Sequence, residues 1–195
     1  WRLIALPQVV ATPHIAASTK EAQEQVGEET AAAVRDFLKE GIIRNAVNFP
    51  SVSMEEYKRL RPYLLLAKHL GSIVGQMGQA RIQTVGVRYY GELAAEQSQL
   101  LGSAVLEGIF SAILSSGGVT PVNARAVAAE RSIEVIESRS TRSRNYTSLI
   151  SVKLQTSEGE RWVEGTAFEN GSLRLVRVDG VSVEAPLGDT LLIIK

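Results

Sequence analysis

The carboxyl-terminal third of this 195-residue chain decides the fold, and residues 146–184 read YTSLISVKLQTSEGERWVEGTAFENGSLRLVRVDGVSVE. Apolar and polar residues alternate through Tyr146–Thr156, which is typical of a β-strand with one buried face. Turn residues follow, and both Asn170-Gly171 and Asp179-Gly180 are strong hairpin signals. The pattern predicts an antiparallel meander packed on helices, with strands at 146–156, 161–169, 173–178 and 181–184.

Two stretches upstream of the meander carry apolar residues at helical spacing. Ser53-Met-Glu-Glu56 is a capping box that starts the first stretch, and Pro62 is expected to begin a new helix after a short turn or kink over Tyr57–Arg61. The second stretch, residues 100–113, is strongly apolar. Gly102 and Gly108 within it would let another backbone approach closely, or would merely cost the helix about 1 kcal/mol each. The remaining elements expected before the meander are a strand at 81–90, a short helix at 123–131 and a strand at 133–137.

The amino-terminal region predicts a short strand, a loop and a long helix. Val9-Val10-Ala11 has the apolar run of a strand buried on both faces. His14 would then lie just past the carboxyl end of that strand, which is the rim where open α/β sheets bind ligands. Ser18-Thr-Lys-Glu21 is a capping box, so a helix is expected over residues 19–40, with Gly41 as its stop. A histidine at such a rim could donate or accept a proton near neutral pH.

Composition excludes several classes of function. The 21 Lys and Arg residues balance 21 Asp and Glu residues, so no net charge favours nucleic acid or a membrane surface. The chain has no cysteine, which excludes disulfides and thiolate metal sites and is compatible with the cytoplasm. Its two histidines, His14 and His69, are too few for a multi-histidine metal site within one chain. No apolar run is long enough to span a bilayer, and neither a phosphate-binding glycine motif nor a nucleophile elbow is present.

A linker is expected at Ile42–Pro50, where asparagine turn-formers precede a proline. The sequence therefore predicts two domains, residues 1–44 and 45–195, and an α+β fold in which a strand–helix segment precedes helices packed on the meander. Trp1 and the apolar run at Leu191–Ile194 are unusual for free termini, because chain ends are usually polar. We expect the chain to be a piece of a longer protein.

One polar segment before the meander carries a concentration of positive charge. Arg139, Arg142 and Arg144 lie within six residues, and guanidinium groups bind phosphate or carboxylate by paired hydrogen bonds. Lys153 and Arg174, like Arg177, lie on predicted strands that could reach the same face. The segment therefore predicts an anion site, although the same residues would also suit a solvated flexible loop.

Several segments together resemble the D-isomer-specific 2-hydroxyacid dehydrogenase family, and within it the long-form D-3-phosphoglycerate dehydrogenases. The segment ATPHIAASTKEAQEQVGEE at 11–29 resembles the end of the nucleotide-binding domain of that family. The later segments resemble the intervening domain of the long form and occur in the expected order; they are NAVN at 45–48, PYLLLAKHLG at 62–71, VNAR at 122–125 and VEGT at 163–166. The chain stops where the small regulatory ACT domain of the family would begin.

The resemblance implies a Rossmann-like origin for the first segment and a role for its histidine. His14 matches the acid/base that exchanges a proton with the substrate hydroxyl during hydride transfer to NAD. The loop of His14, Ile15, Ala16 and Ala17 matches the one beside the nicotinamide, although Ala16 stands where the family often has Gly. The catalytic arginine, the glutamate that orients the histidine and the glycine fingerprint of the family are not in this sequence. The resemblance therefore implies that the 195 residues alone are inactive and bind no NAD.

The same resemblance implies that residues 45–195 form an allosteric substrate-binding domain, similar to a domain of bacterial serine dehydratases. It favours the anion-site interpretation, in which Arg139, Arg142, Arg144, Lys153 and Arg174 bind a phosphorylated or carboxylate small molecule. A cytoplasmic homo-oligomer active in L-serine biosynthesis is the expected parent, with neither nucleic acid nor a membrane as partner. Two alternatives are a purely structural oligomerisation module and a serine dehydratase-like domain.

Overall fold

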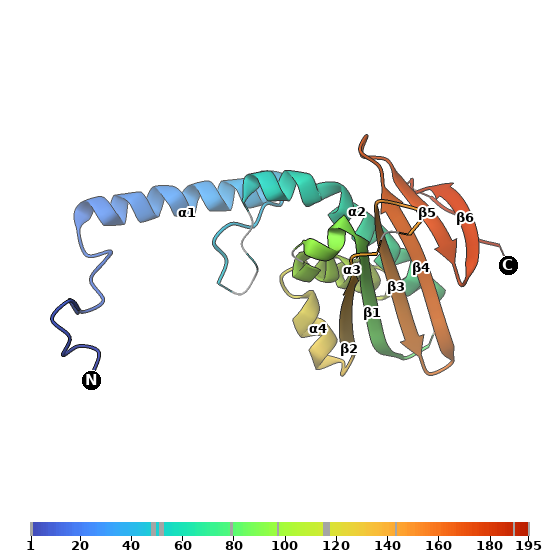
Figure 1. Cartoon of the computed structure of the whole chain (residues 1–195), viewed down its shortest axis with the longest axis horizontal. Helices are drawn as coiled ribbons and strands as arrows, with labels where there is room; N and C mark the ends of the chain where they lie inside the picture. Colours follow the sequence, from blue (N-terminus) through green and yellow to red (C-terminus); the bar gives the residue numbers. More distant parts are fainter. Residues whose placement is uncertain are drawn as a thin grey trace. The chain divides into compact units, whose positions relative to one another are not determined.

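The computed structural model describes residues 2–47, 50, 53–78, 80–96, 98–114, 118–142, 144–188 and 190–194, without the side chains of Met54 and Ser98. The chain divides into two compact units, Trp1–Ser53 and Met54–Lys195, which are described separately (Figure 1). No helix among the described residues is both long and apolar enough to cross a membrane.

Unit 1 is built on one long helix, α1 (Lys20–Glu40). The helix begins at Thr19, whose hydroxyl accepts a hydrogen bond from the backbone N–H of Ala22 at 3.2 Å. It ends at Gly41, which adopts φ 70°, a left-handed conformation that glycine tolerates best. The predicted helix and its glycine stop are therefore confirmed, with Thr19 in place of Ser18 as the cap.

The strand predicted at residues 9–11 is wrong. These residues have no regular structure, and the side chain of Val10 is 88% exposed. A three-residue apolar run becomes a strand only where neighbouring strands bond its backbone, and unit 1 contains no strand among its described residues. The loop that follows, including His14, is exposed.

Unit 2 is a six-stranded sheet with helices packed on one face, which confirms the predicted fold class. Its strands are β1 (Ile82–Gly91), β2 (Glu134–Ser140), β3 (Ser148–Thr156), β4 (Gly159–Ala167), β5 (Leu173–Val178) and β6 (Val181–Pro186). They lie in the order β2-β1-β3-β4-β5-β6, so that the predicted meander forms β3 to β6 (Figure 1). All neighbours are antiparallel except β1 and β2.

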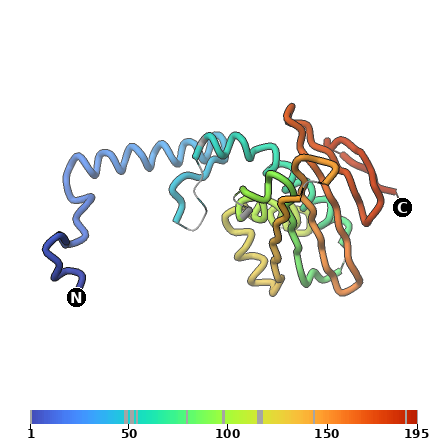
Figure 2. Tube along the Cα trace, in the orientation of Figure 1, coloured from blue at the N-terminus to red at the C-terminus, as the bar shows by residue number. Residues whose placement is uncertain are grey.

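The parallel pairing of β1 and β2 lengthens β2 beyond the predicted 133–137. Parallel neighbours need a long crossover connection, and here it contains a short 3₁₀ helix, η1 (Glu92–Ala95), and the helices α3 (Ser98–Ile113) and α4 (Ala124–Glu130). Figure 2 traces this path from β1 through both α-helices back to β2. Because Tyr89 and Tyr90 pair with Arg139 and Ser140, the first part of the predicted arginine loop is strand.

The predicted start of a new helix at Pro62 is also wrong, because α2 (Met54–Met77) continues through it. Proline inside a helix removes one backbone hydrogen bond and costs about 3 kcal/mol. Tertiary packing offsets this cost, since Leu60 and Leu66 on either side of Pro62 are almost completely buried. The local sequence pattern contains the proline, but it does not reveal the core against which both halves of α2 pack.

Glycines bring α2 and α3 into backbone contact. A Cβ atom on Gly71 would collide with the carbonyl oxygen of Val105, and one on Gly108 would collide with the carbonyl oxygen of Lys68. The pair then packs on the sheet, where a Cβ on Gly165 of β4 would lie 2.9 Å from Leu66 and 3.0 Å from Leu70. The face of the sheet toward α2 is here called the helix-side face, and the opposite one the open face.

We expect Gly108→Ala to destabilise unit 2, because the added methyl group must displace the backbone of α2. Overpacking of this kind costs about 1–3 kcal/mol, or more where only backbone can yield. Gly86→Ala is the matched control, since a Cβ there meets its nearest neighbour, the Lys153 Cβ, at an ordinary 3.6 Å. Urea unfolding of both variants measures the difference, and equal stability of the two would contradict the close contact.

Candidate functional site

The structure distributes the five predicted anion-binding cations over both faces of the sheet. Arg139 pairs in register with Tyr89. Tyr89 shares the helix-side face with the buried Val85 and Val87, because every second residue of a strand points to the same face. Arg144 instead contacts Tyr90, whose side chain points to the open face. Arg139 and Arg144 therefore do not converge on one ligand.

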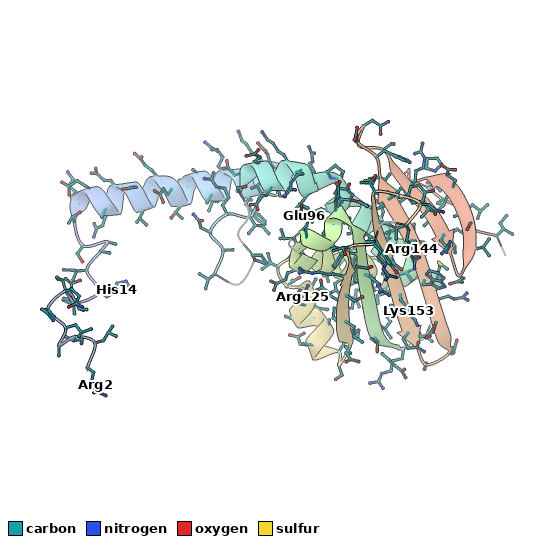
Figure 3. All side chains as sticks on the ribbon, in the orientation of Figure 1. Arg2, His14, Glu96, Arg125, Arg144 and Lys153 are labelled. Atoms are coloured by element: carbon teal, nitrogen blue, oxygen red, sulfur yellow. The ribbon has the colours of Figure 1, made fainter. Side chains whose placement is uncertain are left out.

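The other three predicted cations have separate surroundings. Lys153 pairs with Glu160 at 2.6 Å, and both side chains are about half exposed. Arg142 is an exposed loop residue. On β5, Arg174 donates a hydrogen bond to the backbone oxygen of Leu173 at 3.2 Å. Figure 3 labels Arg144 in the loop before β3 and Lys153 on β3, and Arg144 lines a pocket.

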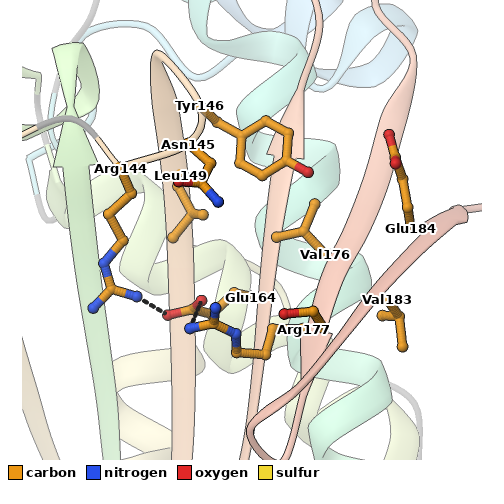
Figure 4. Close-up of a pocket in the computed structure, with 10 residues that line it drawn as sticks. Arg144, Asn145, Tyr146, Leu149, Glu164, Val176, Arg177, Val183 and Glu184 are labelled. Atoms are coloured by element: carbon orange, nitrogen blue, oxygen red, sulfur yellow. Dashed lines mark hydrogen bonds and ion pairs between the residues drawn. The ribbon is translucent and has the colours of Figure 1, made fainter.

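This pocket has a volume of about 640 Å³ and lies on the open face, lined by residues 144–146 and by parts of β3, β4, β5 and β6 (Figure 4). The apolar part of its floor comes from Leu149 and Val176, which form a buried cluster with Tyr90, and from Tyr146, which packs against that cluster. A pocket with an apolar floor and a few convergent polar groups is typical of a small-molecule site.

Glu164 lies between two guanidinium groups at one end of the pocket (Figure 4). Its Oε1 accepts a hydrogen bond from Arg144 Nη1 at 2.9 Å, and its Oε2 lies 3.4 Å from Arg177 Nη1. The Glu164 side chain is 3% exposed, whereas those of Arg144 and Arg177 are 41% and 32% exposed. The two cations compensate the buried carboxylate, which would otherwise be very unfavourable.

Glu164, Arg144 and Arg177 are here called the triad. Each of its two arginines also lies beside an aromatic ring. The guanidinium of Arg144 lies 4.3 Å from the Tyr90 ring centroid and donates to the Tyr90 hydroxyl at 3.0 Å. The guanidinium of Arg177 lies 5.8 Å from the Trp162 ring centroid. The Nε of Arg177 is buried and has no hydrogen-bond partner among the described residues.

A β-bulge aligns Arg177 with Glu164. Near the hairpin turn Gly165 pairs with Leu175, but one step further Glu164 pairs with Arg177, so Val176 is the extra residue. Sequence reasoning noted Arg177 as a strand cation but missed Glu164 and Tyr90. No local signal pointed to Glu164, because Ala167 pairs with Leu173 beside the turn, and that register without the bulge would place Glu164 opposite Val176.

A second polar cluster lies on the helix-side face and joins α3, α4, β1 and β2. Glu137 forms an ion pair with Arg125 and accepts a hydrogen bond from the Tyr89 hydroxyl at 2.9 Å. Arg125 also donates to the Ser103 hydroxyl at 3.2 Å and to the Gln99 backbone oxygen at 3.1 Å. Burial, and secondarily the Glu137 carboxylate, raise the pKa of the Tyr89 phenol far above its ordinary value. These contacts tie the crossover to the sheet.

The predicted catalytic segment lies in unit 1. His14, Ile15, Ala16 and Ala17 are exposed, and the Ser18 N–H closes a turn on the Ile15 oxygen at 3.0 Å. The described residues of unit 1 form one helix and no sheet, so they do not fit the fold that holds a dinucleotide. Within the described part of the chain, no group of three or more His, Cys, Asp or Glu residues could hold a metal ion.

Comparison with known proteins relates this chain to one family. A family profile described as the D-3-phosphoglycerate dehydrogenase intervening domain matches residues 59–179. Curated relatives named D-3-phosphoglycerate dehydrogenase are 37% identical over 192 residues in Synechocystis sp., 36% over 193 residues in Methanocaldococcus jannaschii and 32% over 183 residues in Bacillus subtilis. The alignments cover 98%, 99% and 94% of this chain but only 34%, 36% and 35% of the relatives. The chain thus spans about a third of their length.

We expect stability to fall more steeply above pH 10 in the native sequence than in Tyr89→Phe. The folded state raises the Tyr89 pKa above the ordinary tyrosine value of about 10, so only the unfolded chain ionises this phenol as the pH rises past that value. One pH unit above 10 then removes about 1.4 kcal/mol of the Tyr89 contribution. Denaturant unfolding at pH 9 and pH 11 measures this difference, and parallel losses in both proteins would contradict it.

Proposed function

The chain belongs to the D-3-phosphoglycerate dehydrogenase intervening-domain family, and from this premise we propose that it is the regulatory, anion-binding part of an NAD-dependent D-3-phosphoglycerate dehydrogenase. The family match covers 59–179, which includes β1 to β5 and most of α2. The relatives' name supports a parent that acts on 3-phosphoglycerate at the start of L-serine biosynthesis. Such a parent would be a cytoplasmic homo-oligomer.

The pocket beside Glu164 is the observation that carries the regulatory proposal. It combines the guanidinium groups of Arg144 and Arg177 with an apolar floor, and both charges are only partly exposed. Guanidinium groups in such surroundings bind planar carboxylates and phosphates strongly. Arg142 is close in sequence and can contribute from the loop. Arg174 adds positive charge on the sheet, as does Lys153 in so far as a ligand replaces its ion pair with Glu160. Arg139 is omitted, because its register position lies on the helix-side face.

We expect 3-phosphoglycerate to bind the 195-residue chain in a salt-sensitive manner, because both of its acidic groups suit this pocket. Arg144→Ala should weaken binding about tenfold, since a charge-assisted hydrogen bond contributes roughly 1.5–3 kcal/mol. Arg142→Ala should weaken it less. Calorimetric titration at low and high salt measures the effect.

Arg131→Ala serves as the matched control, because Arg131 is an exposed cation at the end of α4, away from the pocket-lining residues. The affinity of this variant for 3-phosphoglycerate should equal that of the native chain. An affinity that does not change between low and high salt, or that is the same in Arg144→Ala as in the native chain, would count against the proposal.

For the amino-terminal segment we propose that His14 is the proton donor and acceptor of the parent enzyme, with His14 to Ala17 beside its nicotinamide. This role needs the rest of the catalytic region, because unit 1 alone offers no dinucleotide-binding sheet among its described residues. In this chain the exposed loop retains the histidine without the groups that would orient it.

We expect the purified 195-residue chain to produce no NADH from 3-phosphoglycerate and NAD. The sequence contains no Gly-x-Gly-x-x-Gly fingerprint to hold the pyrophosphate. Absorbance at 340 nm is the measurement, and a preparation of a full-length relative is the positive control. A turnover that disappears in His14→Ala would refute the expectation.

A purely structural oligomerisation module is the second candidate. Its support is that β2 and β6 each pair with one strand only among the described residues, and exposed strand edges are sites of sheet extension between chains. The titration above separates the two functions, because a structural module binds no small acid specifically.

A further inference from the structure

Of the two outer strands of the sheet, β2 is the one whose free edge lacks protection. β2 and β6 each pair with one strand only among the described residues. β6 ends at Pro186, which has no backbone N–H to donate, and its register with β5 shifts. β2 contains no proline and pairs with β1 in an unbroken register, and Ile136 on its open face is 49% exposed. Such an edge offers its backbone groups to another strand.

We propose that β2 pairs with β2 of a second copy of this chain, antiparallel and centred on Ser138, so that the two sheets become one across a two-fold axis. The contact is isologous, since both copies contribute the same strand. Residues 141 and 142 follow β2 and are exposed, and the pairing lengthens the strand to include them. The inference rests on the homo-oligomer proposed for the parent enzyme, and it assigns that oligomer an interface and a register.

The charges of residues 134–142 make this segment complementary to itself. The segment reads EVIESRSTR, with two acidic residues before the central serine and two arginines after it. In an antiparallel pair centred on that serine, Glu134 lies opposite Arg142 of the second copy. Glu137 likewise lies opposite Arg139. Each pair occurs twice, so four opposite-charge pairs form and no like charges face each other. Opposite charges across strands stabilise a sheet, whereas like charges directly opposite destabilise it.

The neighbouring registers do not have this complementarity. Side chains alternate between the faces of a strand, so one continuous two-fold sheet requires a residue at its centre. A centre at Glu137 would place this carboxylate opposite its own copy, and a centre at Arg139 would do the same with two guanidinium groups. A centre at Ile136 would form no opposite-charge pair within residues 134–142. The charge pattern therefore selects Ser138.

The outer charge pair contributes more than the inner one. Glu134 and Arg142 are both exposed, so each is accessible to the second copy. Glu137 already forms an ion pair with Arg125 and accepts a hydrogen bond from the Tyr89 hydroxyl at 2.9 Å. A further cation opposite Glu137 adds less to a carboxylate that is compensated in this way. The outer pair is consequently the one to reverse in a test.

Two arginines near the edge are compatible with the contact. Arg88 pairs in register with Ser138, but it lies on β1, one strand inside the edge, and its guanidinium is 5.2 Å from the Tyr90 ring centroid. Arg142 is proposed above to assist the pocket from its loop. In the dimer Glu134 of the second copy competes for this side chain, which agrees with the smaller effect expected of Arg142→Ala on ligand binding.

The chain contains no cysteine, so a single introduced thiol tests the register. In Ser138→Cys the two thiols lie on directly opposite residues, whose Cα atoms are about 4.5–5.5 Å apart, and a disulfide spans this distance. Ser140→Cys is the matched control on the same face, because its Cα atoms would lie about 14 Å apart across the axis. With oxidised glutathione as the electron acceptor, Ser138→Cys should form a covalent dimer at least about tenfold faster than Ser140→Cys. Non-reducing electrophoresis measures both rates.

Charge reversal tests the partner as well as the register. Glu134→Arg alone and Arg142→Glu alone each place like charges opposite each other twice, and each should weaken the dimer about tenfold. An equimolar mixture of the two variants should restore native affinity, because every reversed charge then faces an opposite one. Glu169→Arg, at an exposed turn residue outside the segment, should leave the affinity unchanged. Sedimentation equilibrium over a concentration series measures these affinities.

The outcomes separate this interface from the oligomer on which it rests. Equally fast cross-linking of the two cysteine variants, or a mixture no tighter than the single reversals, overturns the proposed register. A 195-residue chain that stays monomeric overturns the interface, while the mass of a full-length relative tests the homo-oligomer separately. A dimer that persists in both reversal variants and does not cross-link through Ser138→Cys overturns the interface but leaves the oligomer. If Glu134→Arg does not fold, Glu134→Gln takes its place and should weaken the dimer about threefold; an unchanged affinity would contradict the proposal.

Discussion

The backbone contact between α2 and α3 is the constraint on which unit 2 depends. Gly71 and Gly108 allow each helix to approach the carbonyl groups of the other, and Gly165 lets Leu66 and Leu70 rest directly on β4. The helices therefore cover one face of the sheet. That face is filled by the core, and the pocket beside Glu164 lies on the opposite, open face.

Local sequence patterns predicted most of unit 2 but not the features that depend on distant partners. Alternation and hairpin residues located β3 to β6, and helical spacing located α3. Pro62 misled the interpretation of α2, because no local rule shows that leucines on both sides share one core. The parallel register of β2 was equally invisible, since it is set by the crossover through α3 and α4 rather than by its own residues. In unit 1 the short apolar run at Val9–Ala11 lacked the partners that a strand requires.

In the candidate site, too, the sequence predicts some features and not others. Clustered arginines drew attention to Arg144, because charge density is visible in a sequence, and Arg144 lines the pocket. The face on which each arginine lies depends on strand register, and the register places Arg139 on the helix-side face. The bulge at Val176 then fixes which cation meets Glu164. A buried acidic residue among cations has no sequence signature, so the charge balance of the pocket emerged only from the three-dimensional arrangement.

The parallel edge pair has a consequence for the order of folding. Strands β3 to β6 join neighbours in sequence, so their contacts close short loops and can form early. Strand β2 can join β1 only after the chain from Glu92 to Ile133 has been arranged, a longer closure with a greater entropic cost. Arg144 follows β2 directly and rests on Tyr90 of β1. We therefore expect the contact of Arg144 with Tyr90, beside the pocket, to form later in folding than the β3–β6 meander.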